Sequence, residues 1–470
     1  MAPHPHVGDE VAEALASCRI DARPPGARIL SFMVGGIACG ASLGIAATAA
    51  SLLTLSASPP TAMLLLLALV AGALAGAAID TRVRMSAEPR RWAVAAWIVA
   101  AGCWLLTTLL QAGHLPTALA CAPVVPAAAA LIVAVSMHTR CGLDTVRHDQ
   151  RPLLRLAQWV GAMLGVVLAY SIGSTLALAG RAPILPLWVG IAAMSLLGCA
   201  AASAQTPSAR VLLGRGDVAA GVRAIVQSGR CPRSRVATEV TRILIGASLL
   251  DIVPRVHRHE ATRRSVRIGC VLALAVGTGG LGAWALVMPV LLLHTRAPLA
   301  LALSLTLAGF ALSTICLVVY SMPHSPLAAM IDADPEGIVV RVGAANAAVV
   351  GAASLAAGLG IGPLPVGIGL IVSIVLGSAI LVPAGITAIR SRVPRFSLRI
   401  VRYVLYGSHM AGIVVVAVAA CLGWPALATA VPALAHAGAV LAAWGGLRRA
   451  PAPRVKLPHG QAGRKGGQWR

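Results

Sequence analysis

The chain alternates between long apolar runs and short polar connections over almost its whole length. A bilayer core of about 30 Å needs roughly 20 apolar residues in a helix, because lipid offers the backbone no hydrogen-bond partner. On this basis the pattern predicts twelve membrane-spanning helices. They lie at about 29–55, 61–79, 92–113, 115–137, 153–178, 183–204, 266–293, 297–321, 341–361, 363–389, 400–423 and 426–447.

The positions of the basic residues test this span count independently. Lys and Arg stay in the cytosolic loops of membrane proteins and are rare in short translocated loops. With twelve spans and a cytosolic N-terminus, all of the 38 Lys and Arg except Arg181 and Arg296 fall on the cytosolic side. We therefore expect a multi-pass protein of the cell membrane with both termini in the cytosol.

Composition agrees with a membrane protein rather than a soluble one. Apolar residues make up 58% of the chain and charged residues only 11%, where soluble proteins carry about 25%. A net charge of +23 would suggest nucleic-acid binding in a soluble chain. Here the charges follow the loops between spans, so we expect the lipid bilayer as a partner and no nucleic acid.

The expected fold is all-α, with the spans in two sets of six around a polar middle segment. In that segment Val236, Val240 and Ile243 recur at helical spacing with charged residues on the other faces. This helix either rests on the inner membrane surface or docks on a partner. The expected divisions are a cytosolic segment 1–28, spans 29–204, a basic loop 205–265, spans 266–447 and a basic tail 448–470.

No motif predicts an enzyme, a cofactor or a metal site. Gly277, Gly279 and Gly282 match GxGxxG but fall inside the seventh span, where no strand precedes them. The ten cysteines occur singly, without a CxxC pair. In the later spans the only ionisable candidates are His409 and His436. They are interpreted either as packed histidines or as members of a proton relay.

Glycines at every fourth position let two helix backbones approach closely. Two interpretations are open for them, packing between spans of one chain and a contact between two copies. The glycines are Gly36, Gly40 and Gly44 in the first span, Gly72 and Gly76 in the second, and Gly161 and Gly165 in the fifth.

The loop after the second span resembles a motif of the major facilitator superfamily. Residues 76–84 read GAAIDTRVR, which is similar to the G-x-x-x-D-R-x-G-R loop at this place in that family. Gly76, Asp80 and Arg84 fit the motif, while Thr81 replaces a basic residue and Val83 replaces a glycine. The six-plus-six layout also suits that superfamily, so this resemblance implies a secondary transporter for small-molecule efflux.

Three other segments together resemble EccD, the multi-span membrane component of type VII (ESX) secretion systems. Residues 7–14 read VGDEVAEA, similar to the segment that leads EccD into its membrane domain. Residues 255–265 read RVHRHEATRRS, similar to the approach to the seventh span, and Pro394 and Arg399 fit the approach to the eleventh. The order of the segments agrees with EccD, without the ubiquitin-like domain that EccD carries at its N-terminus.

The EccD resemblance implies a structural role as a dimer that encloses a vestibule in the inner membrane. The partners it implies are the ATPase, EccB and EccE components of the secretion apparatus. Contacts with them are expected on the basic cytosolic segments, at Arg255, Arg258, Glu260, Arg395 and Arg399.

We therefore predict a component of a secretion apparatus, with a major-facilitator-type transporter as the alternative. A transporter should have two halves related by a pseudo-twofold axis and a polar site near the midplane of the membrane. A secretion scaffold should have no such site. The small number of polar residues in the spans favours the scaffold.

Overall fold

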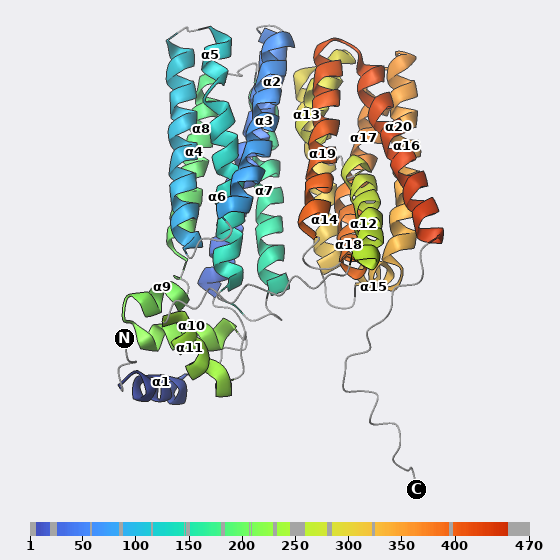
Figure 1. The fold of residues 1–470 in the computed structure, drawn as a ribbon. Helices are drawn as coiled ribbons and strands as arrows, with labels where there is room; N and C mark the ends of the chain where they lie inside the picture. The colour runs from blue at the N-terminus through green and yellow to red at the C-terminus, as the bar shows by residue number, and fades with distance from the viewer. Residues whose placement is uncertain are drawn as a thin grey trace.

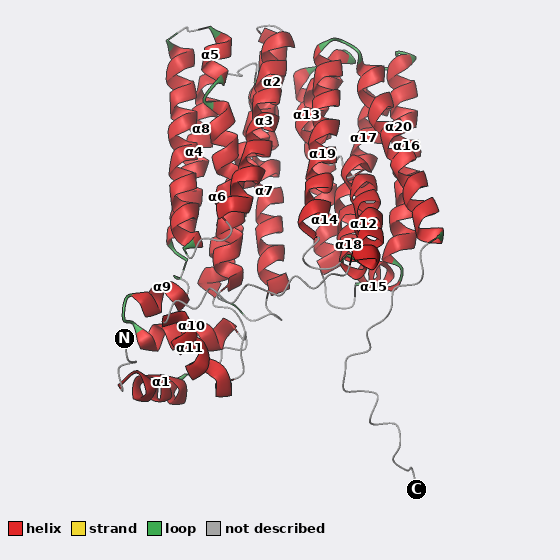
Figure 2. Cartoon of the chain, viewed as in Figure 1, coloured by secondary structure: helices red, strands yellow, loops and turns green. Residues whose placement is uncertain are grey.

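The computed structural model is built from helices throughout its described part (Figures 1 and 2). The expected all-α, polytopic membrane fold is confirmed, and no strand occurs in the described ranges. These ranges are 6–18, 26–56, 59–83, 88–113, 116–144, 146, 151–179, 184–205, 207, 209–228, 233–244, 259–279, 284–321, 325–393 and 398–449.

Among the described residues, eleven helices are long and apolar enough to cross a membrane, and six of them precede the middle segment. Each coincides with a predicted span to within a few residues, because the ends of a span are set where apolar side chains stop. The six are α2 (Gly26–Ser56), α3 (Pro59–Val83), α4 (Pro89–Ala112), α6 (Val124–Asp144) preceded by the short α5 (Thr117–Cys121), α7 (Arg151–Leu178) and α8 (Ile184–Ser203).

The other five follow the middle segment. The tenth span is one long helix with a central π-helical turn, η4 (Leu376–Leu381), between α17 (Pro363–Val375) and α18 (Val382–Arg392). A short helix, α15 (Pro326–Ala333), leads into the ninth span. The remaining spans are α14 (Leu299–Ser321), α16 (Pro335–Gly358), α19 (Leu398–Cys421) and α20 (Pro425–Arg448).

The stretch predicted as the seventh span is covered by two helices, α12 (His259–Gly279) and α13 (Trp284–His294). Neither of them is among the eleven helices that qualify individually as spans. Both pack against α19, with α12 toward the end of the bundle that carries α15 and α13 toward the other end (Figure 1).

The two halves use the same packing scheme. In the first half, the first span (α2) packs on the fifth and sixth (α7, α8), and the third (α4) packs on the fourth and sixth (α6, α8). Six spans later, α12 packs on α19 and α20, and α16 packs on the tenth span and α20. The second and fourth spans pair in both halves as well. Contacts between the halves follow the same relation. The fifth span (α7) packs on the eighth (α14), and the second (α3) packs on the eleventh (α19), so exchanging the two halves turns one contact into the other.

The short helices α1 (His6–Ser17) and α9–α11 (residues 209–244) lie below one end of the bundle (Figure 1). We call that end the basic face and the other end the opposite face. Near the opposite face one buried apolar cluster continues through both halves and includes Leu53 and Leu65 with Met288 and Leu303. Toward the basic face the halves have separate cores. One contains Trp97 and Met137, and the other contains Leu272 and Val401.

Four short helices form a separate unit beside the basic face of the first half (Figure 1). Helix α1 (His6–Ser17) packs with α9 (Ala209–Gly214), α10 (Val218–Ser228) and α11 (Val236–Leu244), and a 3-10 turn η1 (Arg233–Arg235) precedes α11. Val11 of α1 is buried together with Val222 of α10 and Val236 and Val240 of α11. The apolar face of the amphipathic helix α11 is therefore covered by α9, α10 and α1 of the same chain.

Candidate functional site: a polar cluster at the middle of the second half

Two carbonyl groups in the last turn of α12 accept hydrogen bonds from side chains of other spans. The Asn346 amide of α16 donates from Nδ2 to the Gly279 oxygen at 2.9 Å. The His409 ring of α19 places Nδ1 3.3 Å from the Gly277 oxygen. Side chains of two other spans therefore meet the backbone of α12 at this turn.

His436 of α20 lies against the same turn and is only 2% exposed. Its Nδ1 is 3.4 Å from the Thr278 hydroxyl oxygen. That hydroxyl donates its own hydrogen to the Leu274 oxygen at 2.7 Å. The imidazole also packs so closely on Gly279 that a Cβ there would overlap it. Glycine at position 279 is therefore what allows the ring to reach the helix.

The depth of this cluster in the bundle follows from the helices that carry it. Asn346, His409 and His436 are each the twelfth residue of a 24-residue span. A residue at the centre of a spanning helix lies near the midplane of the membrane. Sequence reasoning singled out the two histidines but missed Asn346 and Thr278, although a polar side chain in the centre of an apolar run was a usable signal.

The first half also buries a histidine, but near the basic face. His138 of α6 is 1% exposed, and its Nε2 lies 3.0 Å from the Gln205 amide nitrogen beyond the end of α8. The same amide approaches the Ser31 hydroxyl, which donates to the Ala201 oxygen at 2.7 Å. The Phe32 ring meets the imidazole edge to face at 5.4 Å. These contacts tie the ends of α2, α6 and α8 together.

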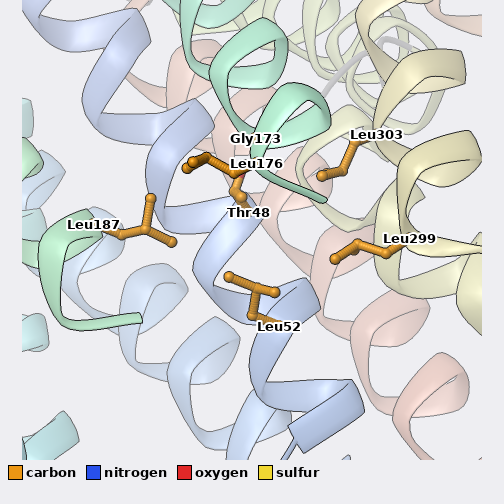
Figure 3. A pocket seen from close by; sticks show the side chains of 7 residues that line it. All are labelled: Thr48, Leu52, Gly173, Leu176, Leu187, Leu299 and Leu303. Atoms are coloured by element: carbon orange, nitrogen blue, oxygen red, sulfur yellow. The ribbon is translucent and has the colours of Figure 1, made fainter. Parts of the chain in front are cut away.

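Aromatic and aliphatic side chains join the halves from the middle of the bundle toward the opposite face. Tyr170 of α7 stacks on Phe310 of α14, with ring centroids 5.9 Å apart. Between α2, α7, α8 and α14 lies a small gap of about 10 Å³, room for about one water molecule (Figure 3). Its lining is apolar apart from one hydroxyl, and consists of Thr48, Leu52, Gly173, Leu176, Leu187, Leu299 and Leu303.

The glycines of the first span lie against the fifth span of the same chain. A Cβ added to Gly36 or Gly40 would overlap the α7 backbone at Gln158 or Ala162, and Gly44 faces the same helix. The α7 glycines return the contact, because a Cβ on either would collide with the backbone of α2. These are Gly161, which faces Met33, and Gly165, which faces Ile37.

The second glycine pair lies between the second and fourth spans. Gly72 faces the Val125 oxygen and Gly76 faces the Ala129 oxygen, and a Cβ on Gly76 would stand 2.6 Å from that oxygen. Of the predicted transporter loop, Asp80 is 5% exposed at the end of the second span, and Arg84 lies outside the described residues.

The predicted cytosolic partner surface is mostly beyond the described ranges. Arg255, Arg258 and Arg395 lie outside them. Glu260 and Arg399 belong to the first turns of α12 and α19, with their side chains outside the described part. Across the described residues, no group of His, Cys, Asp and Glu could hold a metal ion.

A bundle of two six-span halves with repeated packing is the architecture of a secondary transporter fold. Neither a protein-family model nor a curated protein matches this chain. Its structure is similar to that of the E. coli xylose transporter XylE in a partially occluded inward-open conformation, with a TM-score of 0.64 at 12% identity over 89% of this chain and 98% of XylE. It is also similar to an auto-inhibited peptide transporter of the POT family, with a TM-score of 0.61 at 13% identity over 92% of this chain and 98% of that one.

The fold is thus similar to that of the major facilitator superfamily symporter XylE, and the predicted secretion scaffold is wrong. Nothing supports the EccD resemblance, the dimer, or the ATPase, EccB and EccE partners. Two of the resembling segments are basic approaches to spans, which positive-inside topology produces in any such protein. The third, residues 7–14, lies mainly in α1, which packs on the middle segment.

Proposed function

We propose that this protein is a secondary transporter that moves a small, uncharged and largely apolar molecule across the cell membrane. The observation that carries the proposal is the repeated packing of two six-span halves that share one core at the opposite face only. Halves joined at one face and separate at the other are what alternating access by rocking of two bundles requires. The similarity to xylose and peptide transporters supports the same reading.

The substrate class follows from the side chains between the halves. A charged substrate would need a countercharge, because a bare charge at mid-membrane costs about 2.5 to 3.5 kcal/mol on insertion scales. Among the described residues no Asp, Glu, Lys or Arg occupies the central part of a span, and where the halves meet, the small gap between α2, α7, α8 and α14 is lined mainly by leucines. Such surroundings favour an uncharged, apolar compound.

The direction of transport rests on the orientation of the bundle. Because basic residues concentrate on loops at the basic face, we infer that this face and both termini lie in the cytosol. The halves then meet on the outer side and are separate on the inner side. In this arrangement the substrate enters from the cytosol or the inner leaflet, which suits efflux.

A bridging experiment in proteoliposomes tests the proposal. In a cysteine-free background, Tyr170→Cys and Phe310→Cys are joined by a short bifunctional thiol reagent, and efflux of the lipophilic dyes Hoechst 33342 and rhodamine 6G is followed. The bridge should stop efflux, because these residues lie in different halves. The matched control joins Trp104→Cys and Trp188→Cys, which stack at 5.6 Å within the first half. That bridge should leave efflux intact, and full efflux across a complete 170–310 bridge would overturn the proposal.

A second measurement separates the mechanism from the choice of dye. Spin labels at Arg82 and Arg390, both exposed at the basic face of different halves, should show two distance populations. Labels at Arg82 and Arg91, both in the first half, should show one. A single population for the first pair under all conditions would contradict alternating access even if a dye leaked.

A further inference from the structure

The polar cluster around the last turn of α12 contains two buried acceptor atoms that lack a hydrogen-bond donor. These are Nε2 of His436 and Oδ1 of Asn346, on side chains that are 2% and 1% exposed. Buried polar atoms are nearly always paired, because an unpaired one costs about 1–3 kcal/mol. Two such atoms beside one turn of α12 indicate that a hydrogen-bond donor completes the site.

The hydrogen-bond roles around His436 show what is missing. The Thr278 hydroxyl gives its hydrogen to the Leu274 oxygen, so it can only accept from His436 Nδ1. In the neutral ring Nε2 then carries a lone pair. The backbone of Gly343 lies beside that nitrogen, and the Asn346 amide already donates to Gly279. The described surroundings therefore offer acceptors to Nε2.

The carbonyl oxygens of Gly277 and Gly279 point into the cluster near the midplane of the membrane. Hydrogen bonds accepted from a charged form favour that form, so carbonyl oxygens stabilise a protonated histidine beside them. Here the last turn of α12 meets Asn346, His409 and His436 at that depth.

We propose that this cluster is a proton-binding site, in which His436 takes up a proton on Nε2 and is held as an imidazolium by the backbone carbonyls of Ala275 in α12 and Gly343 in α16. The lone pair of Nε2 forms the new N–H bond, and no other bond breaks. The coupling of this proton to a substrate rests on the transporter function proposed above. The binding itself does not.

The charges near the site are few. His409 of α19 is the other titratable side chain at this depth, half-buried against Gly277. The charged side chains of the helices packed on α20 lie toward the basic face, and His294 of α13 lies near the opposite face. They include Arg264 and Arg267 of α12, Glu336 and Arg341 of α16, and Arg402 of α19, with Arg448 on α20 itself.

A pH step applied to proteoliposomes on a solid-supported membrane tests the site without any substrate. The wild-type protein should give a transient charge displacement, and His436→Gln should reduce it at least fivefold. Asn346→Leu should keep the displacement and move its midpoint by about one pH unit toward acid, since it removes a polar side chain from the buried cluster. His138→Gln, which removes the buried histidine near the basic face, should leave the displacement unchanged.

The outcomes distinguish this site from the transporter function. Charge displacement without dye efflux would support the site while the proposed function fails, and dye efflux without displacement would overturn the site alone. A displacement driven by a Na⁺ step at constant pH and lost in His436→Gln would also overturn it, in favour of a metal cation. If His436→Gln does not fold, ¹⁵N-histidine spectra of the wild type must show the His436 Nε2 resonance titrating, or the proposal fails.

Discussion

The first span of each half packs on the fifth and sixth spans of the same half, yet the contacts are built differently. In the first half Gly36 and Gly40 of α2 bring two bare backbones together along α7. In the second half Gly277 of α12 faces the Ser408 hydroxyl as well as the Leu405 oxygen of α19, and Gly279 faces the His436 ring of α20. Small residues serve backbone contact in one half and make room for polar side chains in the other.

This difference sets what each half can do. Where the backbones of α2 and α7 touch, no side chain is able to exchange hydrogen-bond partners. The two helices are therefore expected to move as a rigid unit. A contact made by Ser408, His409 and His436 carries hydrogen-bonding groups that are able to exchange partners. The second half thereby has chemistry at the midplane, while the buried histidine of the first half, His138, lies near the basic face.

The largest effect is expected from filling the first-half seam with Gly40→Leu. The added Cβ would overlap the Ala162 backbone, which cannot turn away. We expect a loss of more than about 3 kcal/mol, at the upper end of overpacking costs, and little folded protein. Fluorescence-detected size-exclusion chromatography with a thermal ramp measures this. Gly102→Leu on the exposed face of α4, where a Cβ meets nothing, is the control and should behave as wild type.

The matching change in the second half is Gly279→Ala, whose Cβ meets a side chain instead of a backbone. We expect a loss of about 1–3 kcal/mol, because the His436 ring is forced from its place. Combining it with His436→Ala should recover part of that loss, with a coupling energy of about 1–2 kcal/mol in a double-mutant cycle. In the first half Ala162→Gly should rescue nothing, since the obstacle at Gly40 is a carbonyl. Recovery of stability by Ala162→Gly would show that the two halves do not differ in this way.

A third comparison concerns the starts of the third and ninth spans. Glu88 pairs with the exposed Arg91 in the first turn of α4. Glu336 at the start of α16 instead forms a two-bond pair with Arg392 of α18, whose side chain is 11% exposed. Glu336→Gln should lower stability by about 1–2 kcal/mol and Glu88→Gln by less than about 0.5, because exposed pairs contribute little. Equal losses of stability in thermal unfolding would show that the Glu336–Arg392 pair stabilises the protein no more than the Glu88–Arg91 pair does.

Most of the spans were predictable because each is an apolar run that lipid forces into a helix. The start of the ninth span was not. The prediction placed it at 341, whereas α16 begins at Pro335 and includes Glu336 and Arg341. Sequence hydropathy counts both as loop residues, but Glu336 is neutralised by Arg392 and Asp334 pairs with Arg341 at 2.8 Å. This six-residue error moved Asn346 away from the midpoint of its predicted span.

The candidate site was visible only in fragments. His409 and His436 stood out because ionisable residues are rare in spans. Their convergence on Gly277 and Gly279 depends on how α12, α19 and α20 rotate about their axes, and an apolar pattern without a polar face does not fix that rotation. The docking of α1 on α10 and α11 was hidden for a related reason. Two amphipathic helices about 200 residues apart do not reveal in sequence that they cover each other.

The smallest predicted effect concerns the turns that follow the ends of helices. Three described helices end in the same hydrogen-bonded motif with a left-handed glycine, at Gly216, Gly360 and Gly423. Helix α13 ends in that motif with Arg296, whose φ is 64° and whose N–H bonds the Leu293 oxygen at 3.1 Å. A left-handed residue with a Cβ costs about 1 kcal/mol relative to glycine. Arg296→Gly should therefore raise stability by about 0.5–1 kcal/mol, and Gly423→Ala should lower it by a similar amount.

Charge offers a competing explanation for any gain at this position, because Arg296 is one of two basic residues expected outside the cytosol. Arg296→Gln removes the charge and keeps the Cβ. If the backbone is the cause, Arg296→Gln leaves the thermal midpoint where it is, Arg296→Gly raises it, and Arg296→Asn falls between them, since asparagine tolerates the left-handed region better than most residues. A gain for Arg296→Gln equal to that for Arg296→Gly would assign the effect to charge and would show that this turn, despite its φ, is not strained.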